Sequence, residues 1–189
     1  MTPGGPVDGG TAGPPAPAPG PVDIGIVAAL PIEVGHLLDR LARVRTIRGP
    51  KHRVIEGELG SKLVALMISG PGRPAARRAT HLLINGHRPR WLLSVGFAGA
   101  LDPSLPRNAV LLATEVRDLE GARWSIDVTG PGDEPSPRVR AGTLLTVSQI
   151  VRTAQEKADL RERFGADAVD METAAVAEAC AERQVRMLS

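Results

Sequence analysis

The sequence predicts an α/β fold of three layers, in which a mixed central sheet lies between flanking helices. Short apolar runs that are typical of buried strands alternate with segments whose apolar residues recur at helical spacing. The core has to be aliphatic, because 42% of the 189 residues are hydrophobic while 2% are aromatic and none is tyrosine. A chain of this length can bury a core as one domain.

The first half of the folded part predicts three strands and two helices. Residues 23–29 are an apolar run that predicts a strand, and a stripe of leucines then predicts a helix over 32–43. A strand pair is expected over 52–58 and 62–69, around a Gly-Ser turn. A helix with one apolar side follows over 74–85.

The second half continues the alternation of strands and helices. Strands are expected over 91–95, 108–113, 143–147 and 166–169. The segment 128–141 is rich in Pro, Gly and charge, which predicts an exposed loop. Helices are expected over 153–163 and from Asp170 toward the end of the chain.

Residues 1–21 differ in composition from the rest of the chain. They are dominated by Pro, Gly and Ala, and they contain no Lys or Arg and no apolar stretch of the kind found in signal peptides. Such a segment cannot bury enough apolar surface to fold, so we expect a disordered leader. The folded domain is then predicted to span 22–189.

Charge and composition disfavour several classes of partner. The formal net charge of +2 is too small to indicate a basic surface for nucleic acid, and aromatic side chains that could stack on bases are scarce, so no nucleic-acid partner is expected. No apolar run approaches the length of a membrane span. Cys180 is the single cysteine and lies in an alanine-rich segment, where it is expected to be a core residue. These features favour a cytoplasmic protein.

The most informative stretch is Val169-Asp170-Met171-Glu172, which precedes a run of small residues. Asp170 is a good helix N-cap. Glu172 is expected on the same helical face as Ala175 and Val176, and a carboxylate among apolar neighbours suggests a ligand hydroxyl as its partner. The alternative is that both acids merely favour the positive end of a helix dipole.

The segment from Gly70 to Ala75 has the spacing G-x-G-x-x-A between a strand and a helix. That pattern is typical of dinucleotide sites, but no Asp or Glu lies between 59 and 101 to hold a ribose hydroxyl. Gly70, Gly72 and Arg73 instead suggest an anion site at the start of the helix. The alternative is that Arg73 and the arginines after it are solvated surface residues.

Several of these candidates are expected at the carboxyl ends of strands. In an open α/β sheet, ligands bind at that edge. Glu33, the Gly70 turn, the turn from Gly96 to Gly99 and Glu172 all follow predicted strands, which predicts one shared site. Glu33 taken alone could equally be an acid that stabilises a helix start. The histidines have no spacing that suggests a metal site, so no metal is expected.

Taken together, the segments resemble the nucleoside phosphorylase and nucleosidase superfamily over residues 24–188. Four motifs carry the resemblance: Ile24 to Ala29 with Glu33 beyond it, Ser69-Gly70-Pro71-Gly72, Gly96 to Leu101, and Val169-Asp170-Met171-Glu172. The bacterial methylthioadenosine/S-adenosylhomocysteine nucleosidases and the hopanoid-associated phosphorylases both look similar to this sequence.

The resemblance implies cleavage of the N-glycosidic bond of a purine nucleoside of the adenosyl or methylthioadenosine type, by hydrolysis or phosphorolysis. In nucleosidases of the family, the acid at the position of Glu33 activates the attacking water. Glu172 would bind the ribose hydroxyls, and Met171 would pack on the sugar. No cofactor is implied, although phosphate would be a co-substrate in phosphorolysis. The resemblance also implies a homo-oligomer for a full-length member.

The sequence departs from the family pattern at three places. Phe97, two residues before Gly99, stands where nucleosidases often have serine, and Ile150 and Val151 stand where an aromatic side chain commonly stacks on the base. The last strand and helix are expected to be missing, because the family's aspartate that protonates the purine would fall beyond Ser189.

These departures leave more than one function open. A complete family member is expected to be an enzyme, but catalysis by the chain as printed is left open. One alternative is a nucleoside- or anion-binding remnant without activity. Another alternative is a dinucleotide-dependent oxidoreductase, which only the glycine spacing from Gly70 to Ala75 supports.

Overall fold

The structure is a computed structural model that describes residues 20–50, 52–128 and 139–189. The expected leader over 1–21 lies outside the described residues except for Gly20 and Pro21, both of which are exposed. Most of the loop expected over 128–141 also lies outside them. The division into a leader and a domain therefore stays a prediction.

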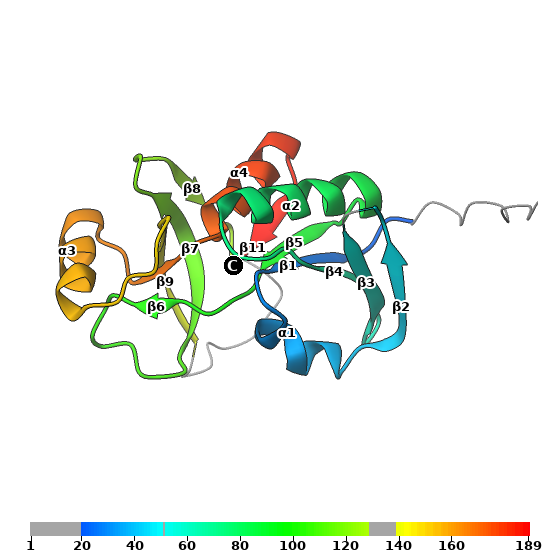
Figure 1. Cartoon of the computed structure of the whole chain (residues 1–189), viewed down its shortest axis with the longest axis horizontal. Coiled ribbons are helices and arrows are strands. Elements are labelled where there is room, and N and C mark those ends of the chain that lie inside the picture. The colour runs from blue at the N-terminus through cyan, green and yellow to red at the C-terminus, as the bar shows by residue number, and fades with distance from the viewer. Residues whose placement is uncertain (1–19, 51, 129–138) are drawn as a thin grey trace, which may run out of the picture.

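A six-stranded sheet forms one half of the molecule (Figure 1). Its order is β11-β5-β1-β4-β3-β2. The strands β1 (Ile24–Ala28), β4 (Lys62–Ile68), β5 (Trp91–Ser94) and β11 (Arg186–Leu188) are parallel to one another. The strands β3 (Arg53–Leu59) and β2 (Ala42–Arg48) continue the sheet in antiparallel pairing to its far edge.

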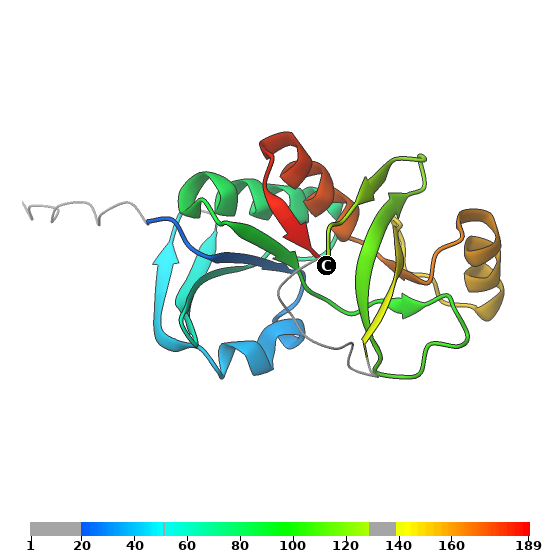
Figure 2. The same ribbon diagram turned by 180° about the vertical axis from the view of Figure 1, so that it is seen from behind.

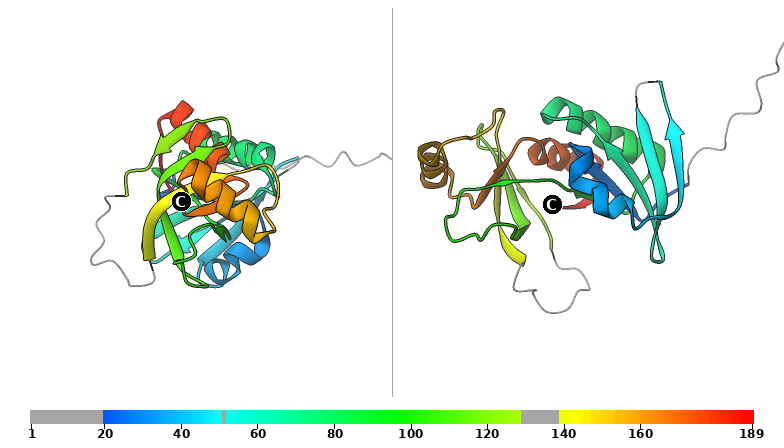
Figure 3. Two further views of the ribbon diagram at one scale, coloured as in Figure 1. Left: turned by 90° about the vertical axis from the view of Figure 1, so that its left-hand side faces the viewer. Right: turned by 60° about the horizontal axis from the view of Figure 1, so that its bottom comes forward.

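A second, five-stranded sheet forms the other half, as the right-hand view of Figure 3 shows. Its order is β6-β10-β9-β7-β8. The bounds are β6 (Gly99–Ala100), β10 (Ala168–Asp170), β9 (Val139–Thr146), β7 (Val110–Asp118) and β8 (Arg123–Ser125). Strand β9 is parallel to both of its neighbours, β10 and β7. The predicted α/β class is confirmed, and the strands divide between two mixed sheets.

The helices cover both faces of the six-stranded sheet. Helices α2 (Arg73–His87) and α4 (Thr173–Arg183) pack together on one face, while α1 (Pro31–Leu38) lies on the other (Figures 1 and 2). Helix α3 (Ala154–Phe164) lies at the outer end of the five-stranded sheet. Helix α4 connects the sheets, because it follows β10 of one and leads into β11 of the other.

The core is aliphatic, as the composition predicts. Its largest fully buried apolar side chains are Leu66, Leu83, Leu92, Leu145, Val34, Val64, Val116 and Val176. The buried side of α4 consists mostly of alanines, which allow α2 and the sheets to approach its backbone closely.

Two predictions about the elements need correction. The helix expected over 32–43 ends at Leu38, and Ala42–Arg48 forms the edge strand β2. That strand is nearly all exposed, so it has no apolar alternation that could reveal it in the sequence. The last strand of the fold was expected to be missing, yet Arg186–Leu188 forms β11 beside β5.

Candidate functional site

The carboxyl ends of the strands bring the predicted acids and glycine turns together. Glu33 lies in the first turn of α1, directly after β1. Gly70 and Gly72 follow β4, and Phe97 follows β5. Glu172 comes from the other sheet, in the turn between β10 and α4. Residues from both sheets therefore meet at one place.

Backbone amides hold both carboxylate oxygens of Glu33. The Leu30 amide donates to Oε2 at 2.8 Å, and the Phe97 amide donates to Oε1 at 3.2 Å. The first bond serves the helix start, whereas the second fixes the carboxylate against the turn after β5. The turn after β5 lies so close to the Glu33 carboxylate that a Cβ placed on Gly96 would be 3.1 Å from Oε1 of Glu33. Glu33 therefore stabilises the helix start and also belongs to the shared site.

Glu172 lies just before α4 and not on its apolar face. The helix begins at Thr173, so the predicted alignment of Glu172 with Ala175 and Val176 is wrong. Its carboxylate instead crosses to the turn after β4, where the Gly72 amide donates to Oε1 at 2.6 Å.

The pKa of Glu172 is raised above its ordinary value. Burial is the largest cause, and the carboxylates of Asp170 and Glu33 add to it, while the hydrogen bond from the Gly72 amide opposes the shift. Glu172 is therefore a half-buried acid with a second carboxylate close by, which is the environment in which functional acids occur.

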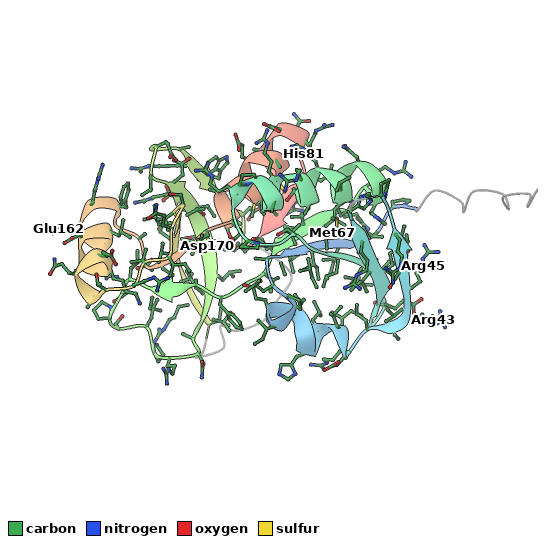
Figure 4. The ribbon with its side chains drawn as sticks, in the orientation of Figure 1. Arg43, Arg45, Met67, His81, Glu162 and Asp170 are labelled. Atoms are coloured by element: carbon green, nitrogen blue, oxygen red, sulfur yellow. The ribbon has the colours of Figure 1, made fainter. Side chains whose placement is uncertain are left out.

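Asp170 caps the turn that carries Glu172. Its Oδ2 accepts from the Thr173 amide at 2.8 Å and from the Glu172 amide at 3.3 Å, and its Oδ1 accepts from the Thr146 hydroxyl at 2.6 Å. The N-cap residue of α4 is Glu172, so the predicted N-cap position of Asp170 is wrong, but its side chain does accept from the amide of Thr173, the first residue of the helix. Figure 4 shows Asp170 between the two halves of the molecule. Oδ2 thus serves the turn, whereas Oδ1 ties the turn to Thr146 of β9; a contact of Asp170 with a substrate stays a prediction.

The other predicted substrate-binding residues lie in varied surroundings. Met171 and Val151 pack against one apolar cluster of the five-stranded sheet. Phe97 and Ile150 are 69% and 64% exposed. Gly99 lies in β6, where a Cβ would come within 3.3 Å of the Val169 side chain. Contact of these residues with a ligand stays a prediction.

Arg73, which was proposed to bind an anion, already has carboxylate partners. Arg73 pairs with Asp118 at 3.3 Å and with Glu120 at 3.1 Å. Arg77 of the same helix pairs with two glutamates of α4. The stretch around Arg73 is free of acids in sequence, but the fold brings acids to it from β7 and its turn. This arrangement leaves little positive charge for a phosphate.

Sequence reasoning missed a row of hydroxyl groups beside the site. The Ser94 and Thr173 hydroxyl oxygens are 3.0 Å apart, and the Ser189 hydroxyl lies 3.5 Å from that of Thr173. Ser94 and Ser189 end or follow parallel strands, which is the signal that could have revealed them.

Other site classes find little support in the structure. Within residues 20–50, 52–128 and 139–189, no three His, Cys, Asp or Glu side chains gather in a way that could hold a metal ion. Cys180 is buried in the core, as predicted, and burial raises the pKa of its thiol to about 12. In the described part of the chain, no helix combines the length and apolar character needed to cross a membrane.

Comparison with known proteins points to one family. The family model described as "Phosphorylase superfamily" matches residues 23–137 and 127–189. A 5'-methylthioadenosine/S-adenosylhomocysteine nucleosidase of Pseudoalteromonas translucida is 26% identical over 186 residues, covering 84% of this chain and 78% of the relative. The Glaesserella parasuis nucleosidase of the same name is 34% identical over 111 residues, which are 59% of this chain and 46% of that relative.

A solved structure shares the fold. The nucleosidase of that name from Neisseria meningitidis, in complex with methylthio-immucillin-A, aligns with a TM-score of 0.78 at 23% identity. The alignment covers 88% of this chain and 82% of that one. The fold predicted from the sequence is thus confirmed by an independent structure.

Proposed function

This chain belongs to the phosphorylase superfamily, and we propose that it cleaves the N-glycosidic bond of a purine nucleoside of the adenosyl or methylthioadenosine type. The relatives described above carry the name of a nucleosidase for such compounds. One observation carries the proposal: Glu33 and Glu172 reach the same site from different sheets, each held by a backbone amide of the turn after another strand.

The proposed reaction adds water across the bond between the sugar and the base. The water oxygen bonds to C1′ of the ribose, while the C1′–N9 bond breaks and its electron pair leaves with the purine. Glu33 takes a proton from the water, and a proton is returned to the leaving purine. Glu172 accepts hydrogen bonds from the ribose hydroxyls, which become stronger donors as positive charge grows on the sugar.

Water suits this site better than phosphate. Phosphorolysis needs cations for a dianion, but Arg73 and Arg77 are paired with carboxylates, and Glu33 and Glu172 add negative charge. A carboxylate near the sugar can remove a proton from water, whereas it would repel phosphate. The reaction transfers no electrons between the partners, so we expect no redox cofactor.

The setting of the reaction is also part of the proposal. We place the protein in the cytoplasm, without a nucleic-acid or membrane partner. We further propose that it forms homo-oligomers, since the large apolar side chains of Phe97 and Ile150 are exposed.

The test measures binding of the nucleoside separately from its cleavage. Binding of 5′-methylthioadenosine to the chain is measured by calorimetry, and free adenine is measured by chromatography with and without phosphate. We expect binding that Glu172→Gln weakens by about tenfold or more, since a charged hydrogen-bond acceptor is lost. Adenine released should be independent of phosphate.

Two outcomes would overturn the proposal. A wild-type chain that binds no nucleoside excludes a nucleoside site, and adenine release that requires phosphate excludes the hydrolytic version. Binding without any release of adenine would instead support the non-catalytic alternative. Glu182→Gln, on the outer surface of α4, serves as the matched control for loss of a carboxylate.

A further inference from the structure

The turn after β4 reaches the other sheet through the backbone amide of Gly72. The Gly72 amide donates to Oε1 of Glu172 at 2.6 Å, across 100 positions of sequence. Hydrogen bonds from an amide to a carboxylate are short and about twice as strong as neutral ones. This contact is therefore a specific one between the two halves of the molecule.

Hydrogen bonds fix both the carboxylate and the main chain of Glu172. Oε1 accepts from the Gly72 amide, and a hydrogen bond from the Met171 backbone also acts on the carboxylate. The backbone next to it is fixed, because Asp170 accepts from the amides of Glu172 and Thr173. Both the main chain and the carboxylate of Glu172 are thus held in place, and Oε2 is the oxygen that does not accept from the Gly72 amide.

We propose that the backbone amide of Gly72 is a positioning group, which fixes the carboxylate of Glu172 so that its second oxygen can accept a ribose hydroxyl. The inference rests on the proposed function for the identity of the ligand, but not for the contact itself. Gly72 positions Glu172 and does not touch the reacting atoms.

The conformation of Gly72 explains why glycine is needed to place this amide. Its backbone has φ 91° and ψ 153°, a region that side chains avoid. An added Cβ would nevertheless meet no atom nearer than 3.9 Å. A substitution there strains the backbone without a collision, so it should turn the amide away from Glu172.

The electrostatics of the site agree with this role. Burial raises the pKa of Glu172, and the carboxylates of Asp170 on β10 and Glu33 on α1 add to the shift. The Gly72 hydrogen bond is the largest influence that lowers it. An ionised carboxylate is a stronger acceptor for hydroxyl groups than a protonated one, and the same amide that orients Glu172 also favours its charged form.

The first test needs no variant of the turn. In the wild-type chain, the amide proton of Gly72 is followed by two-dimensional NMR as a function of pH, with the Gly70 amide as internal reference, since Gly70 donates to the carbonyl of Ala29. We expect the Gly72 resonance to follow the titration of a carboxylate and the Gly70 resonance to change little. In Glu172→Gln, the titration at Gly72 should vanish even though Glu33 and Asp170 remain.

The second test measures binding of 5′-methylthioadenosine. Gly72→Ala should weaken binding about tenfold, the equivalent of losing one charge-assisted hydrogen bond. The matched control is Gly60→Ala, because Gly60 also has a positive φ (60°) and open space but lies in the remote β3–β4 turn. In a Glu172→Gln background, Gly72→Ala should reduce the binding affinity little further, because the hydrogen bond between the Gly72 amide and the Glu172 carboxylate has already been weakened.

The outcomes distinguish this inference from the proposed function. If the Gly72 and Gly70 amides respond alike to pH, or if Gly72→Ala weakens binding equally with and without the carboxylate of Glu172, the positioning role is refuted. A wild-type chain that binds no nucleoside overturns the proposed function, and the NMR titration then decides the positioning role by itself.

Discussion

Replacing Asp170 with alanine should destabilise the protein strongly, because three hydrogen bonds end on this side chain. Its carboxylate accepts from the amides of Glu172 and Thr173 and from the hydroxyl of Thr146. Thr146 is fully buried and also accepts from the Ala174 amide. Alanine would leave two amides at the start of α4 and a buried hydroxyl without their acceptor.

The expected loss follows from these contacts. Removing a helix cap costs about 0.5–2 kcal/mol, and a buried donor without an acceptor costs about 1–3 kcal/mol. We therefore expect Asp170→Ala to lower the free energy of unfolding by about 2–4 kcal/mol, which corresponds to a Tm lower by roughly 5–15 °C for a chain of this size. Urea and thermal unfolding followed by circular dichroism measure both quantities.

The isosteric variant separates capping from ligand binding. Asp170→Asn keeps an oxygen that can accept from the two amides, and asparagine is itself a good cap, so about half of the loss or less should remain. If Asp170 serves the turn alone, this variant should bind nucleoside nearly as well as the wild type. If the free energy of unfolding of Asp170→Ala differs from that of the wild type by less than about 0.5 kcal/mol, the reasoning is refuted, because substitutions at neutral surface positions have effects of that size.

Three further predictions concern groups whose pKa is shifted. Glu172→Gln should stabilise the protein at neutral pH, because a raised pKa means that ionised Glu172 disfavours folding. The gain should fade as the pH falls and be lost below 4.5, where Glu172 is protonated in the unfolded chain as well. Urea unfolding at several pH values measures the difference between variant and wild type, and a difference that does not change with pH would contradict this prediction. Burial lowers the pKa of His87, whose Nδ1 lies 2.9 Å from a carboxylate oxygen of Glu56. The free energy of unfolding should therefore fall as the pH drops below 6.5, where His87 is protonated in the unfolded chain first. His87→Asn should reduce this pH dependence in the same unfolding experiments. Cys180 should react with iodoacetamide at pH 8 only after unfolding, and rapid labelling of the native protein, measured by mass spectrometry, would contradict its burial.

The features that could be predicted from the sequence are those set by nearby residues. The Asp170 carboxylate accepts from amides two and three positions away, so the local pattern reveals these hydrogen bonds. The position of Glu33 after a strand and at a helix start follows from the apolar run before it in the same way. Both features can be predicted because they require no knowledge of the tertiary fold.

The features that could not be predicted depend on distant parts of the chain. Glu172 was expected to face the apolar side of its helix, but its partner is an amide 100 positions earlier, which no local spacing can indicate. Arg73 lies in an acid-free stretch, yet its carboxylate partners come from 45 and 47 positions later. In both cases the tertiary fold decides which charge meets which, and with it the chemistry that the site can perform.

The division of the site between two sheets makes its geometry depend on how those sheets are joined. Glu33 and Gly72 follow strands of the six-stranded sheet, whereas Glu172 follows β10 of the other. Helix α4 begins directly after Glu172 and leads into β11, and the Ser189 carbonyl then accepts from the Ala113 amide of β7. A shift of α4 against α2 would therefore separate Glu172 from Gly72 and Glu33 together. The alanines on the buried side of α4 hold that packing close, so they set the spacing of the acids without touching the site.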